Sequence, residues 1–127
     1  MPSLETLERF IARVEENAHA EAIAEFYAEE GAIRENQQPP RIGRAALVEG
    51  ERRVLARARG VSSRCIRPAL VAGDVVVLRW IFEFDWLDGT YTRMEEIAYQ
   101  RWSGDRILEE QFFYDPTQRI PLPRRPE

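Results

Sequence analysis

The sequence predicts an α+β fold, in which three N-terminal helices wrap a cone-shaped, curved antiparallel sheet. Helical periodicity fills the chain before Val61, whereas strand-like alternation fills it from Val61 to Pro116. The stretch 74–86 alternates for long enough to be the central strand of a sheet whose apolar face needs a cover. Three helices on one side of a curved sheet favour a cone with an internal cavity.

The central stretch has one wholly apolar row of side chains and one mixed row. Because successive side chains of a strand point to opposite faces, the apolar row is expected to face the core. The other row carries Arg79, Glu83 and Asp85, so it is expected to be partly exposed to water. The apolar row consists of Val76, Leu78, Trp80, Phe82, Phe84 and Trp86.

Three helices and a short strand are predicted before the meander. Ser3 can cap the first helix, and Gly31 is a C-terminal stop for the second. Pro39 and Pro40 cannot continue a strand ladder, so they predict a loop. The expected helices are 3–17, 20–30 and 43–60, with a short strand at 32–36 and the loop at 37–41.

Four strands form the predicted meander. Pro68 interrupts the first of them, which indicates an edge strand or a bulge. Asp88 and Gly89 are a strong hairpin signal between the second strand and the third. The expected strands are 61–72, 74–86, 91–103 and 106–115, and Pro116 ends the last one.

Length and composition predict one domain and limit its chemistry. We expect a single domain over 1–116 and a Pro-rich tail over 117–127, either loose or strapped onto a neighbour. The tail superficially suggests a polyproline ligand, and a solvated terminus is the plainer interpretation. One cysteine excludes an internal disulfide, one histidine excludes a His-rich metal site, and the absence of lysine excludes Schiff-base chemistry.

Net charge and hydropathy limit the kinds of partner that the chain can bind. With a net charge of −4 the chain is a poor candidate for nucleic-acid binding. No apolar run approaches the ~18 residues of a membrane span, and the N-terminus lacks a signal-peptide pattern. We therefore expect a cytoplasmic protein that binds neither nucleic acid nor membrane. We also expect no cofactor and no metal, since no residues show metal-ligand spacing.

The order of elements and three strings resemble the nuclear transport factor 2-like superfamily, in its SnoaL-like (polyketide cyclase-like) branch. The strings are FYAEEGAI at 26–33, IGRAAL at 42–47, and an ending that runs from GDRI at 104–107 to FFYDP at 112–116. The resemblance implies the cone fold. The superfamily includes polyketide cyclases, ketosteroid isomerases, limonene epoxide hydrolases, dehydratases and non-catalytic binding proteins, so it does not specify an activity.

The resemblance to individual enzymes of the superfamily is incomplete. Laid against the ketosteroid isomerases, Glu35 falls on their catalytic base, but Phe10 and Ala98 replace their two oxyanion donors. Removal of one such donor typically lowers the rate by on the order of a hundredfold or more, which disfavours that reaction by that route. Against the epoxide hydrolases, Arg79 matches their arginine, but their two aspartates fall on Ile81 and Phe112. The polyketide cyclases use a His/Asp-type pair, and the predicted strands carry no histidine.

The resemblance also implies which side chains face the cavity. With Glu35 and Ala98 inward, strand alternation adds Glu96, and Glu110 on the last strand. Burial raises a carboxyl pKa, so one of these groups can act as acid while another acts as base. The predicted catalytic residues are Glu35, Glu96 and Glu110. The predicted ligand-binding residues are Asn36, Trp80, Phe82, Gln100, Trp102, Phe112, Tyr114, Phe10 and Tyr27.

Plainer interpretations of the carboxylates stay open. The opposite register of strand 91–103 would put Glu96 on the surface. Glu96 or Glu110 could instead form a structural ion pair with Arg64 or Arg67.

Three further polar residues also have plain interpretations. Asn36 could orient a ligand or only satisfy the turn before Pro39. His19 is expected to be a solvent-exposed residue at a helix start, and Cys65 a small buried hydrophobe.

The outer face of the sheet mixes charges with large apolar groups. A contiguous surface of this kind usually marks an interface, and proteins that this chain resembles often dimerise through it. We therefore expect a two-fold homodimer with Arg–Glu pairs across the seam. The face consists of Arg79, Ile81, Glu83, Arg93, Glu95, Ile97, Tyr99, Arg101, Gln111 and Phe113.

Three functions remain open. The leading one is binding of a small, largely apolar molecule in the cavity, with cofactor-free acid–base catalysis of isomerase, cyclase or dehydratase type by Glu35. The alternatives are a non-catalytic ligand-binding protein and a dimeric protein-interaction module. The substitution Glu35→Gln separates the first two, and the cavity volume separates the third from both.

Overall fold

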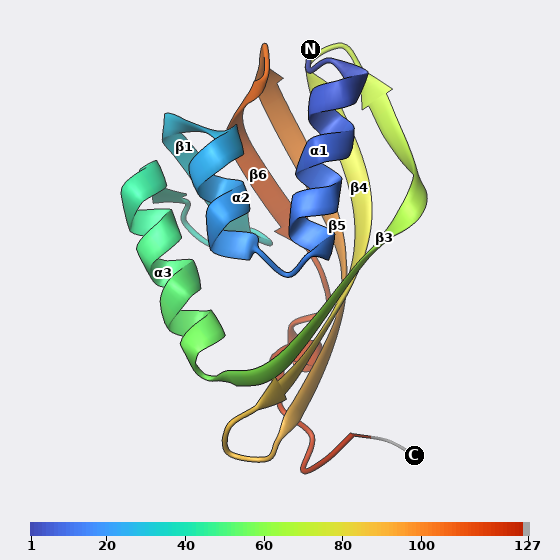
Figure 1. Cartoon of the computed structure of the whole chain (residues 1–127). Helices are drawn as coiled ribbons and strands as arrows, with labels where there is room; N and C mark the ends of the chain where they lie inside the picture. The colour runs from blue at the N-terminus through green and yellow to red at the C-terminus, as the bar shows by residue number, and fades with distance from the viewer. Residues whose placement is uncertain (126–127) are drawn as a thin grey trace.

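The computed structural model describes residues 1–125 and has the predicted α+β architecture. Two helices come first, a third follows the first two strands, and a six-stranded sheet makes up most of the rest (Figure 1). The helices are α1 (Leu4–Glu15), α2 (His19–Phe26) and α3 (Arg44–Ala56), with a 3₁₀ turn, η1 (Pro116–Arg119), near the end. The strands are β1 (Tyr27–Glu35), β2 (Arg41–Ile42), β3 (Ala58–Ala72), β4 (Val75–Trp86), β5 (Tyr91–Ser103) and β6 (Arg106–Phe113).

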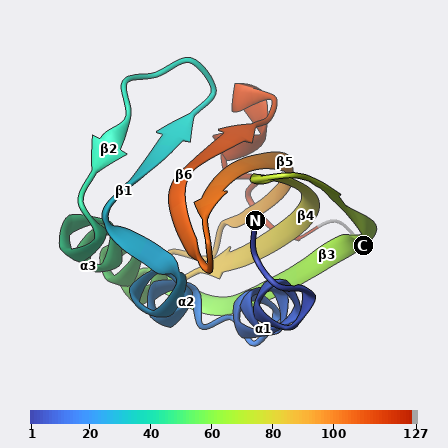
Figure 2. The ribbon, with the colours of Figure 1, turned by 90° about the horizontal axis from the view of Figure 1, so that it is seen from above.

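The sheet is curved, unclosed and mixed. Its strand order is β2-β1-β6-β5-β4-β3, and every pair is antiparallel except β1 with β6. The three helices lie side by side along one side of the curved sheet (Figure 2). The predicted meander of four antiparallel strands is confirmed. Strand β1 can join it in parallel because β2, α3 and the first three strands of the meander separate β1 from β6 along the chain.

The core lies between the helices and the inward row of β4. Val76, Leu78 and Trp80 are at most 1% exposed, as the alternating pattern predicts. Towards the end of the strand, Phe84 and Trp86 are only partly buried. The first residues of the apolar row therefore belong to the core, whereas the last ones border an open space.

The edge position predicted from Pro68 is confirmed. Strand β3 is the outermost strand, and its register with β4 shifts between Ile66 and Leu70, which places a bulge at the proline. A proline is tolerated there because its missing N–H breaks no central ladder.

The second helix ends four residues earlier than the sequence predicts. Tyr27 already belongs to β1, and Gly31 is a strand residue instead of a helix stop. A Cβ on Gly31 would lie 2.9 Å from the carbonyl oxygen of Ala28 and 3.1 Å from Cδ2 of Tyr27. The glycine therefore permits a close backbone approach, where the register of β1 against β6 shifts between Tyr27 and Ala32.

Two other boundaries differ from prediction for the same reason, namely tertiary pairing. The predicted loop 37–41 ends in β2, because Arg41 and Ile42 pair with β1. The third helix ends at Ala56 instead of Gly60, because Ala58 already pairs with Trp86 of β4.

The described part of the tail packs along β5 on its own chain. Strand β6 ends opposite Ile97, and the tail continues along the edge that this leaves free. The side-chain oxygen of Gln118 accepts a hydrogen bond from the N–H of Glu95 at 2.8 Å, and Leu122 forms a bridge with Tyr91. The last two residues of the predicted tail, 126–127, lie outside the described residues. Among the residues described, no helix is long and apolar enough to cross a membrane.

Candidate functional site

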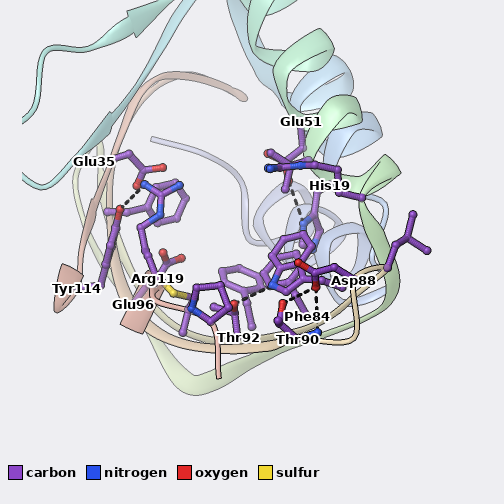
Figure 3. A pocket seen from close by; sticks show the side chains of 18 residues that line it. His19, Glu35, Glu51, Phe84, Asp88, Thr90, Thr92, Glu96, Tyr114 and Arg119 are labelled. Atoms are coloured by element: carbon purple, nitrogen blue, oxygen red, sulfur yellow. Dashed lines mark hydrogen bonds and ion pairs between the residues drawn. The ribbon is translucent and has the colours of Figure 1, made fainter. Parts of the chain in front are cut away.

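A pocket with a volume of about 590 Å³ opens beside the end of the apolar row of β4. Its apolar walls are mostly aromatic, whereas its polar groups come from α2, α3, β1, β5, η1 and the turn between β4 and β5 (Figure 3). The aromatic walls are Phe82, Phe84, Trp86, Phe112 and Tyr114. A pocket of this size and lining is typical of sites for small molecules.

A second, smaller pocket of about 100 Å³ adjoins the first on the side of the core. Five residues border both spaces, so they stand where the two meet: His19, Glu35, Glu51, Phe82 and Phe112. We call the larger space the main pocket and the smaller one the inner pocket.

Glu35 is the last residue of β1 and is held weakly. One carboxylate oxygen, Oε1, lies 3.4 Å from Nη2 of Arg41, whose side chain is more than half exposed. The other oxygen, Oε2, is buried and has no hydrogen-bond partner among the described residues. A buried acceptor without a donor is costly, so this oxygen is a natural place for a ligand group or a water molecule.

Glu96 borders the main pocket from β5. Burial, together with the charges of Glu35 and Glu110, raises its pKa from 4.5 to about 8. Arg119 of η1 acts in the opposite direction. At neutral pH the side chain therefore carries a proton that it can donate.

Glu110 lies at the inner pocket on β6, in a buried hydrogen-bond network. The hydroxyl of Tyr27 donates to its Oε1, and Nε2 of Gln100 donates to its Oε2 at 2.5 Å. The indole N–H of Trp102 donates to Oε1 of Gln100 at 3.0 Å and so fixes the orientation of that amide. Burial raises the pKa of Glu110 to about 7 against the lowering effect of these two donors.

The inward register of β5 and β6 is the one that the resemblance implied. Met94, Ala98 and Trp102 are at most 7% exposed, whereas Tyr99 of the opposite row is 44% exposed. The proposed structural ion pairs do not form among the described residues: Arg67 pairs with Glu8 at 2.7 Å.

The predicted site residues fall into three groups. Those that border the main pocket are Glu35, Phe82, Glu96, Phe112 and Tyr114. Phe10, Tyr27, Trp80 and Glu110 border only the inner pocket. Neither pocket is bordered by Asn36, Gln100 or Trp102. Gln100 hydrogen-bonds to Glu110, and Trp102 hydrogen-bonds to Gln100.

Asn36 borders neither pocket and joins strand β1 to the end of strand β6. It has a left-handed backbone with φ of 50°. Its Oδ1 accepts a hydrogen bond from the N–H of Tyr114 at 3.0 Å, and its own N–H donates to the carbonyl of Phe112 at 2.7 Å. These contacts fix Glu35, the residue before it, against the end of β6.

His19 corrects the sequence-based expectation of an exposed residue. It is only 9% exposed and borders both pockets. One signal in the sequence could have identified it. His19 lies on the same helical stripe as Ala22, Ile23 and Phe26, at spacings of three, four and seven, and this is the buried face of α2. Cys65 is 7% exposed and is not in a disulfide, so it is the small buried hydrophobe that was expected.

Within residues 1–125, no cluster of histidine, cysteine, aspartate and glutamate side chains is arranged to hold a metal ion. The polar groups of the main pocket are instead dispersed over two walls. This arrangement suits proton transfer to and from an organic ligand.

The chain belongs to the SnoaL-like domain family, whose pattern matches residues 7–110. Among curated proteins, none matches the sequence. Solved structures of the same fold are similar at low sequence identity, and at such identities they show the fold alone.

Three of these structures illustrate the range. A Mesorhizobium loti protein classed with the SnoaL-like polyketide cyclases is 22% identical, with a TM-score of 0.72 over 87% of this chain and 97% of its own. An epoxide hydrolase of M. tuberculosis, similar to LEH, is 12% identical, with a TM-score of 0.74 over 92% and 85%. TerC, co-crystallised with polyporic acid, is 16% identical, with a TM-score of 0.73 over 90% and 92%.

Proposed function

We propose that the main pocket binds a small, largely apolar molecule with a carbonyl or hydroxyl group and transfers protons on it without a cofactor. Glu35 is the base, and Glu96 is the acid. The chemistry is that of an isomerase, cyclase or dehydratase, in which a proton leaves one atom of the ligand and another is added nearby.

One observation carries this proposal, namely the contrast between two carboxyl groups on one pocket. Glu35 Oε2 is a buried acceptor without a donor among the described residues. The pKa of Glu96 is about 8, so its carboxyl group carries a proton at neutral pH. Two carboxyl groups whose environments differ in this way are the usual basis for a division into base and acid.

Glu96 also compensates for what the sequence lacks. The two oxyanion donors of the ketosteroid isomerases are replaced by Phe10 and Ala98, which are both buried and apolar. Glu96 is two residues from Ala98 on the same inward row of β5. A protonated Glu96 can therefore donate to the oxygen that gains charge when Glu35 removes a proton from carbon.

A simple ketone tests the proposal without knowledge of the natural ligand. We would incubate the protein with 2-tetralone in D₂O and follow exchange of the protons next to the carbonyl by NMR. The matched control is Glu29→Gln, since Glu29 lies on the same strand and is exposed. We expect exchange to be faster than in buffer with the native chain and with Glu29→Gln. With Glu35→Gln it should be slower by on the order of a hundredfold.

A second function, ligand binding without turnover, is favoured by the loss of both oxyanion donors. It predicts that 2-tetralone quenches the fluorescence of Trp86, a pocket residue, while exchange stays at the buffer rate. Absence of both binding and exchange would contradict either form of the proposal.

We also propose that the chain forms a homodimer through the outer face of the sheet. Ile97, Tyr99 and Phe113 are 37% to 44% exposed on that face. Arg79 and Glu95 pair within the chain at 3.5 Å, so the apolar side chains are the better candidates for contacts across the seam. Light scattering of Tyr99→Glu against the native chain tests this, with a monomer as the expected result for the variant.

A further inference from the structure

We infer that His19, together with Glu51, forms a second proton-bearing site of the main pocket and holds an oxygen at the end of the ligand opposite Glu35. The ligand class is then an aromatic or alicyclic molecule with an oxygen function at each end. This inference rests on the proposed function, because it concerns the same pocket. It adds the kind of ligand group that binds at the end opposite Glu35.

Three elements fix the position of His19. It is the first residue of α2, Glu51 comes from α3 and Ser63 from β3. Nε2 of His19 lies 2.7 Å from Oγ of Ser63, and Nδ1 lies 3.3 Å from Oε1 of Glu51. Figure 3 shows His19 and Glu51 on one side of the pocket, with Glu35 and Glu96 on the other.

The directions of these hydrogen bonds follow from their partners. The hydroxyl of Ser63 donates to Oδ1 of Asn17 at 2.8 Å, so its oxygen must accept from His19. Nε2 of His19 therefore carries a hydrogen. A carboxylate can only accept, so the contact between Nδ1 and Glu51 needs a further proton on one of these two groups. The pair that borders the pocket is thus a proton donor.

The contact between His19 and Glu51 leaves room for a ligand. Charge-assisted hydrogen bonds between nitrogen and oxygen are typically about 2.7–2.9 Å long, and this one is 3.3 Å. The side chain of Glu51 is also 26% exposed, whereas that of His19 is 10% exposed. A ligand oxygen can share the proton without having to break a short ion pair.

The apolar surroundings favour a ring system between the two polar ends. The imidazole of His19 lies edge-on to Phe82, with 5.3 Å between the ring centroids, and to Phe84, with 6.5 Å. Phe82 and Phe112 border both pockets, as His19 and Glu35 do, so aromatic rings line the same space as the two polar groups. A flat apolar ring fits against such surfaces.

The same three residues could be taken for a Ser–His–Glu nucleophile, and the hydrogen bonds argue against it. In such a triad the serine donates to the imidazole, which then removes its proton. Here the proton of Ser63 is directed at Asn17, and Ser63 borders neither pocket. Ser63 therefore positions His19, and the ligand meets the imidazole and Glu51.

The experiment uses the fact that His19 is the only histidine of the chain. The chain is labelled with ¹⁵N-histidine and titrated with three probes: naphthalene, 2-naphthol and 2,6-dihydroxynaphthalene. Affinity is measured in parallel by tryptophan fluorescence. We expect 2,6-dihydroxynaphthalene to shift the ¹⁵N signals of His19 and to bind at least about tenfold more tightly than 2-naphthol. This measurement uses only the native chain, so it does not depend on whether a variant folds.

Two variants then assign the effect to the imidazole. In His19→Phe, the ratio of the two dissociation constants should fall below about threefold. Glu49→Gln, which alters an exposed residue of the same helix as Glu51, should keep the native ratio. Equal affinity for both hydroxylated probes, with unchanged ¹⁵N signals, would overturn this inference and leave the ligand pocket standing. Failure of all three probes to bind would contradict the ligand pocket as well.

Discussion

Glu35 raises the pKa of Glu96. The charge of Glu35 is the second largest cause, after burial, of a pKa of about 8 at Glu96, and both side chains border the main pocket. Like charges that share a site cannot both ionise freely, so a proton held at Glu96 stabilises the charge at Glu35.

The stability of the folded chain should fall as the pH rises through the range set by Glu96. Since the pKa of Glu96 in the folded state lies above 4.5, the folded chain binds this proton more tightly than the unfolded chain between about pH 4.5 and 8. Each such proton changes the free energy of unfolding by up to about 1.4 kcal/mol per pH unit. Glu110 also lowers the free energy of unfolding as the pH rises, but only up to about pH 7, because its pKa in the folded chain is about 7.

Urea denaturation from pH 5 to pH 9 separates the two groups. Between pH 7 and 8 the native chain should still lose stability, whereas Glu96→Gln should have reached a plateau. Glu29→Gln should follow the native curve, because Glu29 is exposed on β1. A variant Glu96→Gln with the native slope between pH 7 and 8 would show that Glu96 is not the group with the raised pKa.

Removal of the charge of Arg119 should raise the pKa of Glu96 further. The guanidinium lies on η1, borders the main pocket and favours the ionised form of Glu96. Without it, the carboxylate loses a positive charge that favours its ionised form, so the pKa of Glu96 in Arg119→Ala should lie above the native value. Carboxyl ¹³C NMR measures this directly, with Arg124→Ala as a control from the same segment. A pKa that falls in Arg119→Ala would exclude the assigned role.

Gln100→Leu should destabilise the fold strongly although the side chain touches no ligand space. Gln100 is 0% exposed and joins Trp102 to Glu110. Leucine fills a similar volume but leaves the indole N–H and Oε2 of Glu110 without partners. We expect a loss of about 2–5 kcal/mol in the free energy of unfolding. Gln38→Leu, at an exposed position, should change it little, and a neutral result for Gln100→Leu would mean that the network contributes nothing.

Gly31→Ala should destabilise the chain, whereas Gly50→Ala should not. At Gly31 the added methyl group would meet backbone oxygens at 2.9 and 3.3 Å, and backbone cannot easily move aside. Overpacking of this kind typically costs about 1–3 kcal/mol. Gly50 lies inside α3, with its nearest neighbour 4.0 Å away, so alanine there should gain up to about 1 kcal/mol. Thermal unfolding of the two variants gives opposite signs if the packing around Gly31 is as described.

Much of the fold follows from the sequence, because its signals are local. The alternation in 74–86 predicts β4 and its buried face, and Pro68 predicts the edge position of β3. The boundaries that differ, at Phe26, Arg41 and Ala56, depend on pairing with distant strands. No local pattern contains that information.

The candidate site was predicted less completely than the fold. Strand alternation correctly brought Glu96 to the pocket, because a period of two fixes the face of each residue. The same alternation cannot tell a pocket wall from the layer behind it, so Gln100 and Trp102 were included although they support Glu110. His19 was assigned to the surface because its place at a helix junction outweighed its place on the buried stripe of α2.

The parallel pairing of β1 with β6 has a consequence for synthesis of the chain. As the polypeptide leaves the ribosome, β1 emerges early and has only the two-residue β2 as a neighbour. Its other edge, which pairs Glu35 with Phe112, stays unpaired until β6 has been translated. A nascent chain that has already formed its helices therefore carries an open strand edge until β6 emerges, and only then can the pocket around Glu35 be completed.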